Sequence, residues 1–267
     1  MRHIPKKHFG QNFLTDPAII NSLIDTIQPQ ADDLMAEIGP GLGALTKPLL
    51  ARLKHLHVVE LDRDIVHWMQ NHYPAEKISI HNIDALKFDF SALAQASAGS
   101  ANTRIRVVGN LPYNISTPIL FHLLDQVDAI SDMHFMLQKE VVERMVAEPS
   151  SPAYGRLSVM LQYRLHMENL LTVPPEAFNP PPKVESAFVR AMPYDAPPYP
   201  ATDEALFARV VQTAFAQRRK TLRNTLKGML DDTGFAALGI DPQLRAENLP
   251  VRAFVDIANH LAEDAGD

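Results

Sequence analysis

The 267-residue chain contains no cysteine, which excludes disulfide bonds and zinc sites with thiolate ligands. Its longest apolar runs are interrupted by charged residues or proline well short of the roughly 18 residues that a membrane span needs. The basic start, Met1–Lys7, is not followed by the apolar core of a signal peptide. Among the histidines, His55 and His57 share one face of a predicted strand, but no third ligand accompanies them. We therefore expect a cytoplasmic protein without a membrane or metal partner.

The net charge of −6 argues mildly against a polyanionic partner, but the positive charges are concentrated in two segments. Arg2, Lys6 and Lys7 lie in residues 1–15, which hold no acid. The second segment, 217–227, also holds no acid and contains Arg218, Arg219, Lys220, Arg223 and Lys227. Both segments are candidate contacts for a nucleic-acid backbone, and an ordinary solvated surface is the alternative.

The order of the apolar segments predicts an α/β fold. Strand-like and helical segments alternate from Leu34 to Ala147, which is typical of a parallel sheet covered by helices on both faces. The predicted strands are Leu34–Ile38, His55–Leu61, Ile78–Ile83, Ile105–Gly109 and Met133–Leu137. Two further extended segments, Met167–Val173 and Val184–Ala191, predict an antiparallel pair at the sheet edge.

A proline-rich segment, Pro193–Pro200, is predicted to be a stiff linker. The segments after it are helical in pattern: Asp203–Ala216, Arg219–Met229, a short one near Phe235, and Val251–Glu263. We therefore expect a mostly parallel sheet domain over 1–192, a linker over 193–200 and a small all-α domain over 201–267.

The four residues Asn110–Tyr113 carry the strongest chemical signal. They follow the predicted strand Ile105–Gly109, and Pro112 ends strand pairing, so an amide, free carbonyls and an aromatic ring meet at a strand's carboxyl end. In an open α/β sheet, ligands bind at that edge. The group can hold a planar base by stacking and by accepting hydrogen bonds from its exocyclic amine. A strand-ending turn with a core tyrosine is the alternative.

A glycine-rich turn, Glu37–Gly43, lies between the first predicted strand and the first helix. Glycine there lets the backbone approach a ligand closely. The spacing is G-x-G-x-G, which differs from the dinucleotide fingerprint, and no Walker lysine follows. Glu37 directly before the glycines would repel a pyrophosphate but suits a cationic ligand.

Two more acids end the following strands. Glu60 lies 21 residues beyond Gly39, where a carboxylate can bind ribose hydroxyls. At Asp84-Ala85, a carboxylate can accept from an adenine amine and a backbone N–H can donate to a ring nitrogen. Three acids at successive strand ends, together with the glycines, indicate a positively charged nucleoside such as S-adenosylmethionine.

In this order the motifs resemble the class I S-adenosylmethionine-dependent methyltransferases, which have a Rossmann-like sheet. More narrowly they resemble the ribosomal RNA adenine N6-dimethyltransferases, and among these the bacterial small-subunit enzymes. The matching segments are Phe9–Leu14, Glu37–Gly41, Val59–Asp62, Asp84–Leu86, Asn110–Ser116, Phe178–Ser186 and Phe215–Arg223. One departure is Asn82-Ile83-Asp84, where the family usually has glycine before the aspartate.

The resemblance implies a cofactor site lined by Asn12, Leu14, Gly39, Glu60, Asp84 and Asn110, to which we add Glu37, Gly41 and Ala85 from the same segments. It also implies the substrate: two neighbouring adenosines near the 3′ end of 16S ribosomal RNA within an assembling 30S subunit. A hairpin loop is the reasonable target, because a loop adenine avoids most of the cost of unstacking. The enzyme is expected to act as a monomer.

For the transfer itself we expect position and electrostatics to matter most, because the adenine amine is a weak nucleophile and the leaving thioether is neutral. The side-chain oxygen of Asn110 and the carbonyl of Leu111 would accept the two amine hydrogens. Tyr113 would stack on one face of the base. Phe178, which resembles the family's second aromatic residue, would cover the other face, and local packing within its proline-rich loop is the alternative.

Other functions share parts of this pattern. A 23S ribosomal RNA methylase of the resistance type or a DNA adenine methyltransferase would carry the same core motifs. DNA adenine enzymes usually have two prolines after the acid or Asn, whereas Leu111 stands in the first proline's place here. A non-catalytic ribosome assembly or binding factor could keep the fold without the transfer.

Overall fold

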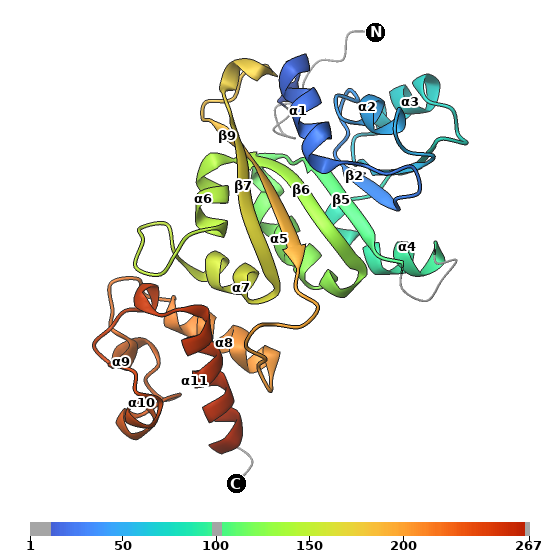
Figure 1. Ribbon diagram of the computed structural model, residues 1–267. Coiled ribbons are helices and arrows are strands. Elements are labelled where there is room, and N and C mark those ends of the chain that lie inside the picture. The colour runs from blue at the N-terminus through green and yellow to red at the C-terminus, as the bar shows by residue number, and fades with distance from the viewer. Residues whose placement is uncertain (1–11, 98–102, 265–267) are drawn as a thin grey trace. The chain divides into compact units, whose positions relative to one another are not determined.

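The computed structural model describes residues 12–97 and 103–264, and their contacts divide the chain into two compact units (Figure 1). The sheet unit runs up to Val142 and includes Met167–Pro193. The helical unit contains Glu143–His166 and the residues from Tyr194 onward. The sequence placed a single division near residue 193. The contacts also put 143–166 with the C-terminal helices, because aromatic residues of this segment pack into their core.

Seven strands form the main sheet in the order β4-β3-β2-β5-β6-β9-β7. Their bounds are β2 Met35–Ile38, β3 Leu56–Val59, β4 Ile78–His81, β5 Ile105–Asn110, β6 Ile130–Gln138, β7 Leu165–Val173 and β9 Ser186–Pro193. Pairing is parallel from β4 to β6 and antiparallel between β6 and β9. The predicted class, a mostly parallel sheet with an antiparallel edge and a helical C-terminal region, is confirmed.

The central strands place the two main motifs side by side. Strand β2 pairs with β3 on one side and with β5 on the other, so the chain order reverses at β2. Ile38 lies opposite Gly109 in the β2–β5 register. The glycine turn after Ile38 and the Asn110 segment therefore leave the sheet next to each other, at the switch point where open α/β sheets bind ligands.

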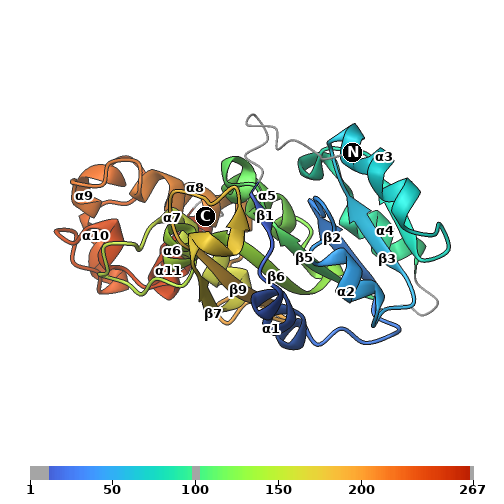
Figure 2. The same ribbon diagram turned by 90° about the horizontal axis from the view of Figure 1, so that it is seen from above.

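Helices cover the sheet from both sides. Those of the sheet unit are α1 Pro17–Ile27, α2 Thr46–Leu50, α3 Arg63–His72, α4 Phe90–Ala96, α5 Ser116–Leu124 and the start of α6 Lys139–Met145. Side chains of α1, α2 and α3 share one apolar core with the strands. In Figure 2, α1 and α5 lie on opposite sides of the sheet. The predicted helix Leu42–Leu53 is shorter, because positive φ angles at Gly41 and Gly43 keep the preceding residues in a turn.

A short second sheet was not predicted. Strand β1, Phe13–Leu14, pairs antiparallel with β8, Phe178–Asn179, and Leu14 lies opposite Phe178. None of the extended segments predicted from the sequence lies in 174–183. This pairing attaches the segment before α1 to the loop between β7 and β9.

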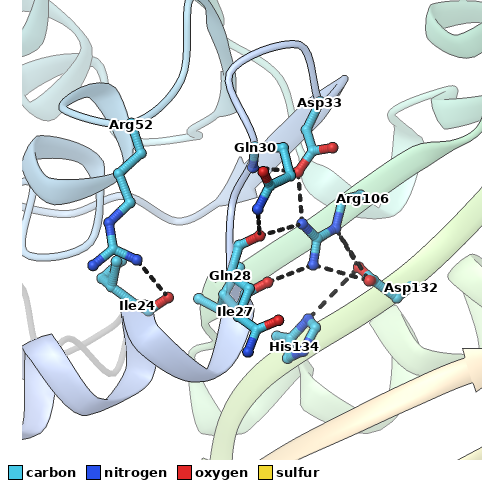
Figure 3. A network of polar contacts seen from close by, with 9 residues as sticks. All are labelled: Ile24, Ile27, Gln28, Gln30, Asp33, Arg52, Arg106, Asp132 and His134. Atoms are coloured by element: carbon cyan, nitrogen blue, oxygen red, sulfur yellow. Dashed lines mark hydrogen bonds and ion pairs between the residues drawn. The ribbon is translucent and has the colours of Figure 1, made fainter.

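A polar cluster at the opposite end of β5 attaches α1 to the sheet (Figure 3). The Arg106 guanidinium donates to Asp33 at 2.6 Å, to Asp132 of β6 at 3.0 Å and to the Ile27 carbonyl at 2.6 Å. The next residue, Gln28, ends α1 in the left-handed conformation. One partly buried cation thus joins the end of α1, the loop before β2 and two strands.

The helical unit has its own core. It contains the end of α6, α7 Arg156–Arg164, α8 Glu204–Ala214, α9 Leu222–Thr225, α10 Asp232–Leu238 and α11 Val251–Asp264. Buried aromatic residues at its centre are Tyr154, Tyr163, Phe207, Phe235 and Phe254. The predicted helix Arg219–Met229 is wrong in extent, since only α9 is an α-helix. Arg218, Arg219 and Lys220 lie in the turn before it. In the parts of the chain that the structure describes, every helix is too short or too polar to cross a membrane.

Candidate active site

A cavity of about 610 Å³ opens at the carboxyl ends of the central strands. Twelve of the predicted site residues line it: Asn12, Leu14, Glu37, Gly39, Gly41, Glu60, Asp84, Ala85, Asn110, Leu111, Pro112 and Tyr113. They come from five separate segments of the chain. The sheet brings these segments together because parallel strands share one carboxyl edge.

The glycine turn is shaped for close approach. Gly39 and Gly41 have φ angles of +63° and +53°, where a side chain is strained. A Cβ atom at Gly41 would lie 3.0 Å from the Phe13 ring, and one at Gly39 would lie 3.8 Å from the Asn110 carbonyl. The two motifs and the β1 segment therefore meet at van der Waals distance.

Glu37 is a buried carboxyl in the wall of the cavity. Only 2% of it is exposed, and it accepts a 2.6 Å hydrogen bond from Thr46, the first residue of α2. Burial raises the pKa of Glu37 to about 8; the Thr46 bond lowers it and the charge of Glu60 raises it further. Thr46 was not predicted as a site residue from the sequence. Its position could have indicated this contact, because it is a hydroxyl residue on the helix that follows the glycine turn.

The other two acids are held by backbone groups. Glu60 accepts from the Asp62 N–H at 2.8 Å, and burial raises its pKa although N–H donors at Asp62, Leu61 and Gly41 oppose the change. Asp84 accepts from the Leu86 N–H at 3.0 Å. Both carboxylates are thus oriented by turns that directly follow their strands.

Asn82 belongs to the segment before Asp84 that departs from the expected family pattern, and the structure shows what its side chain contacts. Its side chain donates to the carbonyls of Glu60 and Leu61 at 2.9 and 3.2 Å. The amide therefore joins the residues after β4 to those after β3, and Asp84 still reaches the cavity.

The Asn110 side chain has a defined orientation. Its Nδ2 atom donates to the Asn12 carbonyl at 3.0 Å. A carbonyl can only accept, so the amide cannot be turned the other way. The Oδ1 atom consequently points away from Asn12 and is the atom that the side chain offers to a donor.

The rest of this motif is anchored on both sides. The Leu111 N–H donates to the Met136 carbonyl of β6 at 3.1 Å, and the Leu111 side chain is buried. Tyr113 lies in a 3₁₀ turn, Tyr113–Ile115, and is half-buried. Its hydroxyl lies 2.8 Å from the Ser186 hydroxyl, and its carbonyl accepts from Ser116 at 2.9 Å.

Phe178 does not join the other site residues. It is 3% exposed and belongs to the apolar core, where Leu14, Ala177 and Phe188 are also buried. Pairing of β8 with β1 holds it there, so in this structure the ring has no free face for a base. The stacking role assigned to it from the sequence requires a different side-chain position.

The candidate RNA contacts fall into three groups. Lys6 and Lys7 lie outside the described residues. Arg218 donates to the Pro152 carbonyl at 2.6 Å and lies 3.5 Å from Glu247, while Arg223 lies 2.9 Å from Asp232. Three exposed cations remain: Arg219, Lys220 and Lys227.

Within the described ranges, no group of three or more histidine or carboxylate side chains is arranged to hold a metal ion. His57 and His81 lie with ring nitrogens 3.1 Å apart. The cavity itself offers carboxyl groups, carbonyls and apolar walls to a ligand.

Comparison with known proteins decides the family. The family model described as Ribosomal RNA adenine dimethylase matches residues 2–263. The chain belongs to this family. As a member of the dimethylase family it is an enzyme, a methyltransferase that acts on adenine in ribosomal RNA.

Similar curated members of the dimethylase family cover almost the whole chain. The Ribosomal RNA small subunit methyltransferase A of Methylobacillus flagellatus is 74% identical over 98% of this chain and 100% of its own length. The protein of the same name from Chromobacterium violaceum is 61% identical over 97% of both chains.

Solved structures agree in fold. A dimethyladenosine transferase from Plasmodium falciparum has a TM-score of 0.72 at 22% identity, covering 92% of this chain and 95% of its own. The 23S rRNA methyltransferase ErmE has a TM-score of 0.70 at 20% identity, covering 94% and 100%. These similarities show a class I methyltransferase fold.

Proposed function

We propose that this dimethylase transfers methyl groups from S-adenosylmethionine to N6 of two adjacent adenosines in a 3′-terminal hairpin loop of 16S ribosomal RNA. The products would be N6,N6-dimethyladenosines, formed during 30S subunit biogenesis. The observation that carries the proposal is the orientation of Asn110, whose Oδ1 is offered to a donor beside the glycine turn.

The residues around the cavity fit S-adenosylmethionine. Glu37, Glu60 and Asp84 supply carboxylates for a ligand that carries a sulfonium, an ammonium and ribose hydroxyls. Apolar side chains at Leu42, Leu61 and Ile83 line the same cavity and suit the adenine ring. The bound cofactor would supply an electrophilic methyl group.

The chain's own groups would position the amine. Asn110 Oδ1 and the Leu111 carbonyl would accept its two hydrogens and favour a pyramidal nitrogen with its lone pair directed at the methyl group. Tyr113 would stack on the base and hold it unstacked from its neighbours. A neutral acceptor remains useful after the first transfer, because the monomethylated amine still has one hydrogen. The same acceptor could therefore position the nitrogen for a second methylation.

The small-subunit substrate rests on the relatives. Proteins up to 74% identical over nearly the full chain carry the name Ribosomal RNA small subunit methyltransferase A. The helical unit, together with the basic N-terminal segment, would bind phosphates of the folded RNA. A precursor of the 30S subunit as substrate would place the enzyme in the cytoplasm, and we expect it to act there as a monomer.

Labelled-methyl transfer to undermethylated 30S particles tests the proposal. Naked 16S RNA, 50S particles and DNA serve as parallel substrates, and nucleoside mapping identifies the modified base. We expect label in the 30S particles, in two adjacent N6,N6-dimethyladenosines. Label confined to 50S particles or DNA would overturn the substrate assignment, and tight 30S binding without transfer would reduce the protein to a binding factor.

A further inference from the structure

Tyr113, the residue proposed to stack on the target base, is held by two serines. Ser116 donates to its backbone carbonyl at 2.9 Å, and Ser186 contacts its hydroxyl at 2.8 Å. Ser116 is a local neighbour at the start of α5, whereas Ser186 is 73 residues away in the sequence. The phenol end of the ring is thus attached to a different part of the sheet from its backbone.

Ser186 is a rigid attachment point. It is fully buried, with an exposed fraction of 0%, and is the first residue of β9. It lies opposite Gln138 in the β6–β9 register. Just before it, Glu185 accepts from the Lys139 N–H at 3.0 Å and pairs with the Lys139 side chain at 2.8 Å. These contacts fix the backbone from which the Ser186 hydroxyl projects.

The same strand, β6, also positions the acceptor of the reaction. Asn110 lies opposite Met136 in the β5–β6 register, two residues before Gln138 along β6. The Leu111 N–H donates to the Met136 carbonyl at 3.1 Å. The Asn110 amide and the anchor of the Tyr113 ring are therefore spaced by one continuous, hydrogen-bonded strand.

This arrangement matters because stacking and hydrogen bonding must act on one base together. A ring that pivots about its own side-chain torsions would let the base tilt, and the amine would leave the line of transfer. Misplacement by about 1 Å can cost about a hundredfold in rate. The hydrogen bond to Ser186 restricts this rotation, because it holds the ring at the end farthest from the backbone.

We propose that Ser186 is a positioning residue for the target adenine: its hydroxyl holds the Tyr113 ring at the height and angle that present N6 to Asn110. The inference rests on the proposed function, since it takes Tyr113 to contact the base. Ser186 itself touches neither the base nor the cofactor in this account, because it does not line the cavity.

A double-mutant cycle tests the proposal, using Tyr113→Phe, Ser186→Ala and the double variant in the full chain with 30S particles. Each single change removes the same hydrogen bond, so we expect kcat to fall by about tenfold in each. The double variant should fall no further than the singles. The affinity for S-adenosylmethionine should stay within about twofold, because the cofactor walls are unchanged.

Ser158→Ala is the matched control, since Ser158 is another fully buried serine that is hydrogen-bonded, to Arg144 and Gly155 in the helical unit. It should lower the melting temperature without reproducing the kcat loss at saturating substrate. Multiplicative losses in the double variant, or normal kcat in Ser186→Ala, would overturn the positioning role. Transfer by the wild-type enzyme is measured in parallel, so failure of the proposed function is separately visible as no transfer at all.

Discussion

The contacts of Asn110 explain why an asparagine occupies this position. The sequence indicated a neutral acceptor for an amine, but any Asn after a strand would satisfy that pattern. The structure shows that Nδ2 donates to the Asn12 carbonyl, which leaves Oδ1 for the proposed contact with the substrate amine. Aspartate has the same shape, but it would place a carboxylate oxygen against the Asn12 carbonyl, and neither group can donate a hydrogen bond.

Asn110→Ala and Asn110→Asp should therefore both fail in methyl transfer, although aspartate is closest in shape. We expect turnover to fall by about 100-fold or more, the magnitude typical for loss of one positioned polar group at a reacting centre. Cofactor affinity measured by calorimetry should change much less. Asn71→Asp on exposed α3 controls for the chemical change, and substantial turnover in Asn110→Asp would refute the two-ended role.

Glu37 offers a test through pH, because its carboxyl keeps a proton in the folded protein up to a pKa of about 8. The unfolded chain releases that proton near the ordinary value of 4.5. Between these values the folded state binds one more proton, so raising the pH favours unfolding. The unliganded wild type should lose stability relative to Glu37→Gln by roughly 1.4 kcal/mol per pH unit from about pH 5 to 8.

Denaturant unfolding at several pH values measures that difference. The single tryptophan, Trp68, packs against the core of the sheet unit and reports its unfolding. Glutamine can still accept from Thr46, so the fold should survive. Glu76→Gln removes a charge from an exposed position and serves as the control. A difference between wild type and Glu37→Gln that does not vary with pH would contradict the buried, protonated state.

Among the elements, α1 shows most clearly how packing supplements local pattern. The helix precedes the first predicted strand, and its attachment depends on Arg106, which lies 79 residues beyond its contact at Ile27. Asp33 and Asp132 complete the cluster, with side chains only 21% and 19% exposed. The helix begins two residues after Thr15, and both Leu14 and Thr15 line the cavity. The cluster therefore fixes the far end of an element whose near end borders the site.

Arg106→Lys should lower the free energy of unfolding of the sheet unit by about 3 kcal/mol. A lysine cannot serve both carboxylates and the Ile27 carbonyl, so partly buried acceptors lose their charged hydrogen-bond partner. Urea unfolding followed at Trp68 measures the loss.

Arg52→Lys is the matched control from the same region (Figure 3), since Arg52 pairs with Asp25 and bonds the Ile24 carbonyl. Its side chain is 43% exposed, so its change should cost less than about 1 kcal/mol. Equal losses in the two variants would mean that the Arg106 cluster has no special stabilising role.

At the scale of the whole molecule, we expect catalysis and RNA binding to be divided between the two units. The cavity and its acids belong to the sheet unit, and the exposed cations Arg219, Lys220 and Lys227 belong to the helical unit. Arg218 and Arg223 have acidic neighbours, so their charges are partly compensated. The net charge of the chain is negative, and RNA must therefore be bound by local clusters.

Replacing Arg219, Lys220 and Lys227 together by glutamine should weaken binding to 30S particles and make it less salt-dependent. Each lost phosphate contact should reduce the slope of log affinity against log salt by about 0.7 to 0.9. Binding of S-adenosylmethionine should be unchanged. Filter binding over a range of salt concentrations provides the measurement.

Three exposed cations of the sheet unit, Lys54, Lys77 and Lys87, provide a control with the same charge change. Their replacement should leave the salt slope close to that of the wild type. If both triple variants change the affinity and the salt slope equally, RNA binding depends on net charge, and the helical unit has no dedicated contact surface.

Much of the site could be predicted from local sequence, because its parts obey one topological rule. In a parallel sheet each strand ends at the same edge, so the glycine turn, Glu60, Asp84 and Asn110 had to converge once the strands were recognised. Their chemistry then pointed to a charged nucleoside facing an amine. The fold class and the antiparallel edge followed from the same segmentation.

What the sequence left open are contacts between residues far apart in the chain. Phe178 carries a suitable ring, but pairing of β8 with β1 buries it. Ser186 and Tyr113 meet only because β6 hydrogen-bonds to both β5 and β9, and Thr46 reaches Glu37 only because α2 packs over β2. The basic segment 219–229 has a helical pattern, yet the core of the helical unit keeps only Leu222–Thr225 helical. Local chemistry is written in neighbouring residues, whereas burial and the orientation of side chains depend on which strands and helices pack together.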